Sequence, residues 1–364
     1  EKIASWKFFL RIVGRFFAQS KDIRYSEEGM HKLRYKLIVL LSVLLLFASQ
    51  LGTICGAAAT EVYVGGMPAG FTLGMGGAQV VGICEVLTEG GTACPAREAG
   101  IEVGDIIVSF NGITISSAED IGNALACSNG RKSQVIVKGD DAESGLEKTV
   151  TPAKDLASGR YKLGVLIRDS ISGIGTVTYI EKDSLRFGSL GHAVANENGK
   201  LMSVDKGEIF KCSIVNVIKG ERGKAGELKG LFMSDAGIAV ADKNCETGIY
   251  GNFNQDYNTQ SLRCAEISLN AQPGKASIFT TVDGITPKEY SVSIVKVDSN
   301  NKQNKNFVLK ITDSELLSAT GGIVQGMSGS PILQAGKLIG AVTHVFLNDP
   351  TRGYGIAINN MMGK

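Results

Sequence analysis

The sequence predicts a mainly β protein, in which an apolar N-terminal segment is followed by a small β-rich domain and then by a double β-barrel. Its length of 364 residues allows two or three domains. It contains 46 glycines and 7 prolines, and its many short β-branched runs favour strands and tight turns over long helices. Across residues 160–364, short strands alternate with glycine, asparagine and lysine turns, which is typical of a closed double barrel.

Charge and cysteine content argue against several functions. The formal net charge of +2 is close to neutral and gives no indication of a nucleic-acid partner. The seven cysteines lack the Cys-x-x-Cys spacing and the nearby histidines of a zinc site, so we predict neither a metal nor a cofactor. Because their number is odd, at least one thiol stays free in any disulfide scheme, and the sequence does not fix a pairing.

Residues 1–36 are basic and aromatic. Apolar side chains recur in them at helical spacing, including Trp6, Phe9, Val13 and Phe17, with lysines and arginines between them. This pattern predicts a basic amphipathic helix that lies on an anionic membrane surface. A disordered cytoplasmic tail is the alternative.

Residues 37–59 form an uncharged, mostly apolar stretch of 23 positions. At 1.5 Å per residue this length can cross a hydrocarbon core of roughly 30 Å, so we predict a transmembrane signal anchor. Lys32, Arg34 and Lys36 precede it, and the positive-inside rule therefore places the N-terminus in the cytoplasm and exports the remainder. The alanines at 57–59 also fit a signal-peptidase cleavage site, which gives the same export.

Residues 61–155 are predicted to form one domain. A helix closed by Gly100, a strand that runs into the turn at Asn111, and a second helix capped by Ser117 follow one another in it. The run Pro-Ala-x-x-Ala-Gly-Ile-x-x-Gly-Asp-x-Ile over residues 95–107 resembles a PDZ domain of bacterial proteases. That resemblance implies a groove in which a peptide adds as a strand and its carboxylate meets an x-Φ-Gly-Φ loop. The sequence Thr72-Leu73-Gly74-Met75 fits this loop; a simple glycine turn is the alternative.

The most informative motif lies near the C-terminus, at Gly326-Met327-Ser328-Gly329-Ser330-Pro331. A serine in such a strand-to-strand turn can hold its hydroxyl clear of the backbone, and the turn can aim two N–H groups at one point. Gly-x-Ser-Gly-x-Pro resembles the nucleophile loop of chymotrypsin-like serine peptidases. We therefore predict Ser328 as the nucleophile and the backbone N–H groups of Gly326 and Ser328 as the oxyanion hole.

A serine hydroxyl needs a base, usually a histidine, and the chain has three. His31 precedes the membrane segment and would lie on the other side of the bilayer. His192 lies in a glycine-flanked turn in the first predicted barrel, which gives the chymotrypsin order of base before nucleophile, and we predict it as the general base. Thr343 and His344 fall in the strand that pairs with substrate in chymotrypsin-like enzymes, so we predict that they line the substrate cleft.

These features together identify a closer resemblance. A membrane segment, a PDZ domain, Leu-Gly-His at 190–192 and Gly-Ile-Val-Gln-Gly-Met-Ser-Gly-Ser-Pro at 322–331 resemble the stage IV sporulation protein B family of serine peptidases, over residues 33–364. The resemblance implies a chymotrypsin-like double barrel at 160–364. It also implies an exported, self-cleaving endopeptidase in the space between forespore and mother cell. Such an enzyme cleaves a membrane-bound regulator, so that an intramembrane protease processes a late sigma factor.

The third member of the catalytic triad is open. In the resembled family, an aspartate shortly before the serine loop has been assigned this role, and Asp313 matches it by position. A chymotrypsin fold supplies the acid earlier in the chain, so Asp205, Asp235 and Asp242 are rivals. Asp313 also suits the N-cap of a short helix that begins at Ser314.

The leading hypothesis is therefore an exported, membrane-tethered serine endopeptidase whose PDZ domain holds a peptide. Its predicted partners are its own chain, a membrane-bound regulator and a peptide ligand. Two alternatives remain from the residues: a PDZ scaffold with an inactive peptidase domain, and a general quality-control protease.

Overall fold

A computed structural model of the protein describes residues 60–139, 144–195, 199, 201–202 and 207–363, together with Tyr35. Apart from Tyr35, the predicted amphipathic segment and the predicted signal anchor lie outside the described residues. Within the described ranges, no helix is both long enough and apolar enough to cross a membrane.

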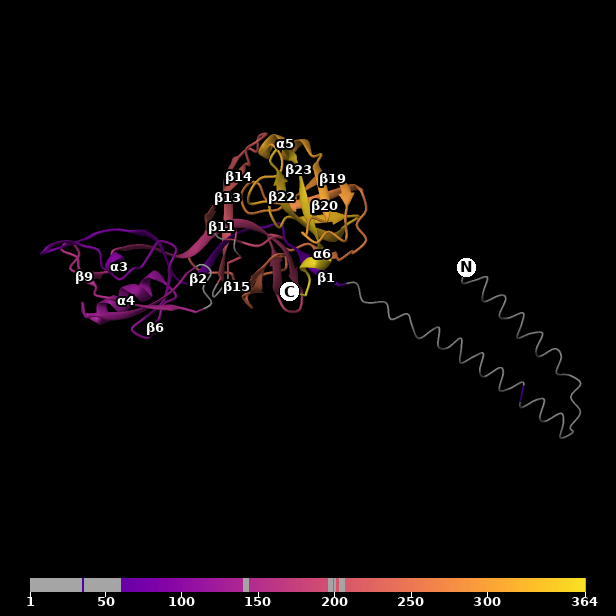
Figure 1. The fold of residues 1–364 in the computed structure, drawn as a ribbon. Helices are drawn as coiled ribbons and strands as arrows, with labels where there is room; N and C mark the ends of the chain where they lie inside the picture. Colours follow the sequence, from indigo (N-terminus) through magenta and orange to yellow (C-terminus); the bar gives the residue numbers. More distant parts are fainter. Residues whose placement is uncertain are drawn as a thin grey trace, which may run out of the picture. The chain divides into compact units, whose positions relative to one another are not determined.

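The C-terminal barrel is closed and is built from strands that are consecutive in the chain (Figure 1). Its strands pair in the order β18-β19-β20-β23-β22-β21. Inward and outward side chains alternate along them, as in β19, where Tyr290, Val292 and Ile294 are buried. The elements are β18 (Gly274–Thr280), β19 (Lys288–Val297), β20 (Phe307–Ile311), α5 (Ser314–Thr320), β21 (Pro331–Gln334), β22 (Lys337–Phe346), β23 (Asp349–Ala357) and α6 (Ile358–Met361).

The N-terminal barrel is a second ring, with strands paired in the order β11-β12-β16-β15-β13-β2. Antiparallel pairing of β2 with β11 closes the ring. Besides strands that lie between β2 and β11 in the chain, three further strands join this sheet: β1 pairs with β11 and β17, and β14 pairs with β13. The elements are β1 (Glu61–Val64), β2 (Pro68–Ile83), β11 (Val165–Glu181), β12 (Arg186–Ser189), β13 (Gly207–Ile218), β14 (Glu227–Phe232), β15 (Ala239–Cys245), β16 (Gly248–Phe253) and β17 (Cys264–Glu266).

The residues between β2 and β11 form the PDZ-like part, and its predicted local structure is confirmed. Ser117 caps α4 in a capping box with Asp120. Asn111 and Gly112 both have positive φ angles, as a tight hairpin turn requires. The elements are β3 (Val86–Thr88), β4 (Gly91–Ala93), α3 (Pro95–Glu98), β5 (Ile106–Phe110), β6 (Ile113–Thr114), α4 (Ala118–Ser128), β7 (Ser133–Lys138), β8 (Leu146–Val150), β9 (Ala153–Lys154) and β10 (Tyr161–Lys162).

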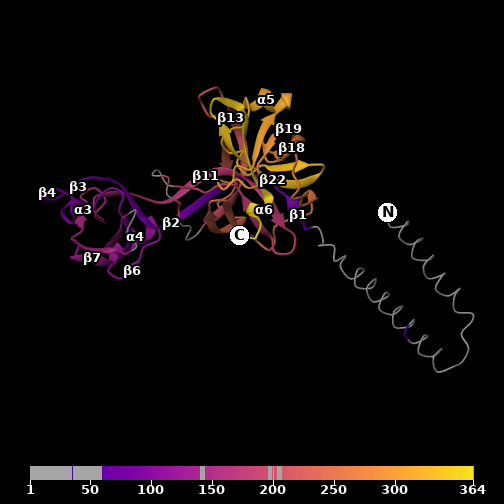
Figure 2. The same cartoon turned by 45° about the vertical axis from the view of Figure 1, so that its right-hand side comes forward.

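The PDZ-like part is inserted into the first barrel rather than placed before it. We predicted one domain over residues 61–155, but β1 and the first half of β2 pair with strands of the first barrel. Strands β2 and β11 run side by side through both parts (Figures 1 and 2). Their register extends from Pro68 opposite Thr176 to Ile83 opposite Val165.

The predicted carboxylate-binding loop at Thr72-Leu73-Gly74-Met75 is wrong. These residues lie inside β2, and Leu73 is opposite Ile171 of β11 on one side and Gly207 of β13 on the other. Leu73 is also 1% exposed and belongs to the core of the first barrel. At Thr72 and Leu73 both edges of the strand are paired, so neither residue offers a free edge to a peptide.

Candidate active site

The nucleophile loop connects α5 to β21 and is held where the two barrels meet. Gly326 and Gly329 have φ angles of 94° and 95°, which side chains rarely allow. A Cβ at Gly329 would collide with the backbone of Thr176 and Leu190, both from the first barrel. The loop therefore needs glycine both for its own conformation and for its contact with the neighbouring barrel.

The two N–H groups predicted to form the oxyanion hole have no hydrogen-bond partner among the described residues. In contrast, the N–H groups of Gln325, Met327 and Gly329 each donate to a backbone carbonyl. The amides of Gly326 and Ser328 thus alternate with paired ones along the loop. This is the arrangement that an oxyanion hole requires, because its donors must be free to bind a substrate oxygen.

His192 follows a turn in which Leu190 and Gly191 both have positive φ angles. Its Nδ1 lies 2.9 Å from the carbonyl oxygen of Ala193. Since a carbonyl only accepts, Nδ1 carries the proton, and Nε2 is left with a free lone pair. Burial of the ring lowers the pKa of His192 below 6.5, although the bond to Ala193 opposes this shift. The imidazole is therefore neutral near pH 7, the form that a general base needs.

Ser328 and His192 line the same cavity, which has a volume of about 440 Å³. The Ser328 hydroxyl donates to the carbonyl oxygen of Thr343, at 2.7 Å. No hydrogen bond joins Ser328 to His192 in the described residues. The structure thus brings the predicted nucleophile and base into one site, with the hydroxyl turned toward β22.

Thr343 and His344 also line this cavity, beside the two residues predicted to react. The His344 ring centroid lies 5.0 Å from that of His192, with the ring planes tilted by 41°. Burial, the neighbouring His192 and the charge of Lys305 lower the pKa of His344, so it too is neutral near pH 7. The Thr343 hydroxyl oxygen is buried and has no hydrogen-bond partner among the described residues.

Comparison with family models identifies the two parts of the chain. The model described as SpoIVB peptidase S55 matches residues 159–362, which is more than half of the chain. This chain belongs to the SpoIVB peptidase S55 family. A PDZ-domain model matches residues 86–138, within the insertion between β2 and β11. No curated protein matches the sequence.

In this S55 peptidase, Asp313 lies at the N-terminus of α5 and not at the cavity. Its carboxylate accepts from the backbone N–H groups of Glu315 and Leu316 and from that of Ser291. Burial raises the pKa of Asp313, and these N–H groups more than offset that and lower it. The geometry supports the capping role, and no hydrogen bond links Asp313 to His192 in the described ranges.

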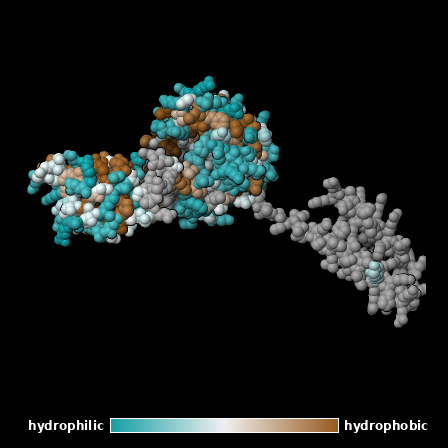
Figure 3. All heavy atoms as spheres, viewed as in Figure 1, coloured by the Kyte–Doolittle hydropathy of each residue, from teal (hydrophilic) through white to brown (hydrophobic). Residues whose placement is uncertain are grey.

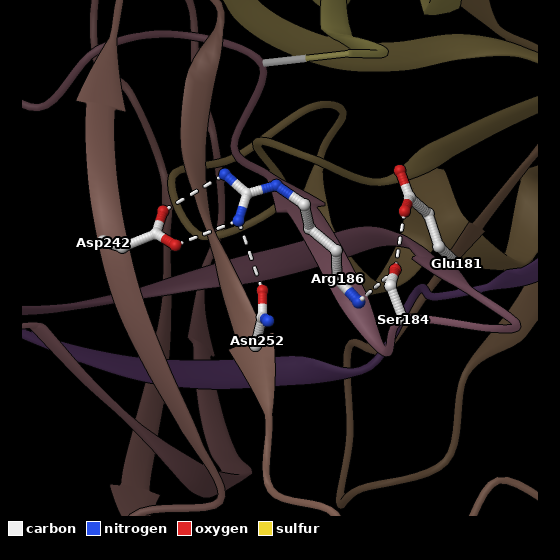
Figure 4. Close-up of polar contacts among 5 residues, drawn as sticks. All are labelled: Glu181, Ser184, Arg186, Asp242 and Asn252. Carbon is white, nitrogen blue, oxygen red and sulfur yellow. Dashed lines mark hydrogen bonds and ion pairs between the residues drawn. The ribbon is translucent and has the colours of Figure 1, made fainter.

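Neither Asp235 nor Asp242, the two rival aspartates among the described residues, forms a hydrogen bond to His192. Asp242 forms a two-pronged ion pair with Arg186, at 2.9 and 3.2 Å (Figure 4). Asp235 is exposed on a loop, and Asp205 lies outside the described residues. The position of an orienting acid is taken instead by the carbonyl of Ala193, which no sequence signal could reveal because every residue has a carbonyl.

Sequence reasoning missed a second x-Φ-Gly-Φ run in this S55 peptidase, Lys162-Leu163-Gly164-Val165. It leads directly into β11, and Leu163 is packed in the core of the PDZ-like part. Helix α4 lies against this end of β11, where the N–H of Ala118 donates to Asp169 at 2.8 Å. The motif was visible in the sequence, but the domain was expected to end at residue 155.

Apolar side chains surround the cavity. Its lining includes Ile174, Val324 and Val345. Hydrophobic residues also gather over β13 and β14 in Figure 3, where Val215 and Leu231 are exposed. The end of this hairpin reaches the nucleophile loop, because the N–H of Leu228 in β14 donates to the carbonyl oxygen of Gln325. A peptide that enters the site would therefore meet an apolar surface.

Proposed function

We propose that this chain is a serine endopeptidase in which Ser328 is the nucleophile and His192 is the general base. One observation carries the proposal: both side chains line a single cavity, and within the described residues neither Nε2 of His192 nor the N–H groups of Gly326 and Ser328 have a hydrogen-bond partner. The family match supports serine peptidase chemistry.

The reaction begins when the Ser328 hydroxyl turns from Thr343 toward Nε2 of His192. Its oxygen attacks the scissile carbonyl while its proton passes to Nε2. The negative charge that develops on the carbonyl oxygen is bound by the N–H groups of Gly326 and Ser328. Protonated His192 then gives the proton to the leaving amine, and water, activated by the same imidazole, hydrolyses the acyl-enzyme.

Thr343 is the residue that couples substrate binding to this rotation. An extended peptide that pairs with β22 donates an N–H to the Thr343 carbonyl. That carbonyl holds the Ser328 hydroxyl in the structure described here. Substrate therefore displaces the hydroxyl and frees it to approach His192. The apolar lining favours a peptide with apolar side chains next to the scissile bond.

The biological substrates that we propose are a second copy of this chain and a membrane-bound regulator of an intramembrane protease. Their cleavage leads to processing of a late sigma factor during endospore formation. We further propose that residues 37–59 anchor the chain in the membrane and that the catalytic part lies outside the cytoplasm, between forespore and mother cell. The uncharged length of 37–59 and the basic residues before it support this location.

The test compares residues 60–364 of the natural sequence with the same chain carrying Ser328→Ala. We expect the first to label with a fluorophosphonate and to shorten on a gel, and the second to do neither. If neither chain labels or shortens, the protein is a PDZ scaffold with an inactive peptidase domain. If the chain instead cleaves unfolded casein as fast as it cleaves a defined regulator peptide, it is a quality-control protease.

A further inference from the structure

Thr176, on β11 of the first barrel, makes two hydrogen bonds to the nucleophile loop of the second. Its side-chain hydroxyl donates to the carbonyl oxygen of Gly326 at 2.8 Å. Its backbone N–H donates to the carbonyl oxygen of Ser328 at 3.0 Å. The residue is 2% exposed, so water does not compete for these contacts. Both oxyanion-hole residues are thus held by one threonine.

The peptide groups that flank this contact are also fixed by their carbonyl oxygens. In a peptide plane the C=O and N–H point in opposite directions, so a bond to the oxygen sets the direction of the N–H. The carbonyl of Gln325 accepts from Leu228 N, which orients the N–H of Gly326.

The N–H of Ser328 is oriented in the same way. The carbonyl of Met327 accepts from the N–H of Ser330 at 3.0 Å and from its hydroxyl at 2.6 Å. The peptide between Gly326 and Met327 lies between the two donor-bearing planes, and its oxygen is the one that the Thr176 hydroxyl holds. If that peptide rotates, the directions of both oxyanion donors change.

Thr176 also contacts the turn that carries the base. Its carbonyl oxygen accepts from the N–H of Leu190 at 3.3 Å, two residues before His192. One buried residue is therefore bonded to the loop of the nucleophile and to the turn of the base.

We propose that Thr176 is a positioning residue that aligns the oxyanion hole of Gly326 and Ser328 through its hydroxyl. This inference rests on the proposed peptidase function. Thr176 touches neither substrate nor a reacting atom; it acts through the Gly326 carbonyl. Loss of its hydroxyl leaves the middle peptide of the loop held only at the N–H of Met327, which donates to the carbonyl of Val324. The peptide then tilts more easily, so the two amides converge less well on the substrate oxygen.

The chain offers a matched control in Thr178, two residues further along the same strand. Its hydroxyl donates to the carbonyl oxygen of Gly329 at 2.7 Å, and it is 0% exposed. That carbonyl belongs to the peptide that ends in the N–H of Ser330, which donates to the carbonyl of Met327. The Ser330 hydroxyl holds the same Met327 carbonyl at 2.6 Å, so the N–H of Ser328 stays oriented without the Thr178 bond. Thr178→Val removes the same kind of buried bond as Thr176→Val, and each isosteric change should lower stability by a similar amount.

The experiment uses the full chain in detergent, with a tagged Ser328→Ala chain as the substrate. Loss of one oxyanion donor costs about 10²–10³ in kcat, so misalignment by Thr176→Val should lower kcat about 10–100-fold with KM unchanged. Fluorophosphonate labelling should slow in parallel. Thr176→Ser should restore activity, and Thr178→Val should stay within about threefold of wild type.

A second readout separates alignment from damage to the base. The acid limb of the pH profile, which reports His192, should not move in Thr176→Val. Equal losses of kcat in Thr176→Val and Thr178→Val, or wild-type kcat in Thr176→Val, would overturn the proposal. Failure of the wild type itself to label would instead refute the peptidase function, so the two failures are distinguishable.

Discussion

The two barrels differ in how the chain builds them. The second barrel uses consecutive strands from β18 to β23 and closes on itself. The first barrel is interrupted, because the PDZ-like part is inserted between β2 and β11. The insertion leaves the cavity end of these two strands paired, where Pro68 faces Thr176 and Leu73 faces Ile171. A barrel can therefore accept a domain at one end of a strand pair and keep the lining of its cavity at the other.

Substitution of the two histidines at the cavity tests which barrel supplies the general base. His192 comes from the interrupted barrel and His344 from the continuous one. We expect His192→Ala to lower kcat about 10⁴-fold or more, because the change removes the imidazole that accepts the serine proton. His344→Ala should cost less than about tenfold. Rates of self-cleavage and fluorophosphonate labelling measure both, and the reverse ranking would move the base to the continuous barrel.

Core truncations test whether the two barrels depend on each other for stability. Phe187 in the first barrel and Phe307 in the second are both almost fully buried. Phe187→Ala and Phe307→Ala should each destabilise by about 3–5 kcal/mol, since each leaves a large cavity. Denaturant melts check this. If the barrels unfold together, both variants shift one shared transition; two separate transitions would show that they unfold independently.

The same difference explains what the sequence could predict. The strands of the second barrel were visible as local alternation. In the first barrel, β1 and β2 look like strands too, but local pattern does not say which sheet a strand joins. The glycines of β2 resembled a binding loop, whereas Leu163-Gly164-Val165 at the start of β11 was not considered.

The catalytic site shows a similar limit. Ser328 was predicted from the glycines of its loop, and His192 from its glycine-flanked turn, the small number of histidines and the order of base before nucleophile. The prediction of Asp313 as the triad acid rested on a family resemblance. In the structure, the group that bonds to His192 is the backbone carbonyl of Ala193. Thr176 could not be found in advance, because the role that we propose for it comes from a hydrogen bond to Gly326, which lies 150 residues away in the chain.

Substitutions at Asp313 distinguish a structural role in the second barrel from a role at the cavity between the barrels. Asparagine caps helices about as well as aspartate, whereas alanine does not. We therefore expect Asp313→Asn to be nearly neutral and Asp313→Ala to cost about 0.5–2 kcal/mol, with self-cleavage kept in both folded variants. Thermal melts and cleavage rates measure this. Loss of activity in Asp313→Asn without loss of stability would restore it as the triad acid.

The smallest expected effect is a pH dependence that comes from the burial of His192 between the barrels. Its pKa lies below 6.5 in the folded protein, so the unfolded chain takes up the proton first as the pH falls. Stability should therefore decline as the pH drops below about 6.5 and level off below the folded pKa. His192→Gln should make this part of the curve shallower, and the remaining slope should come from His344, whose pKa is lowered to about 4. Activity should persist below pH 6.5, because the base stays neutral there. An acid limb of kcat/KM centred above 6.5 would show that another group governs the reaction.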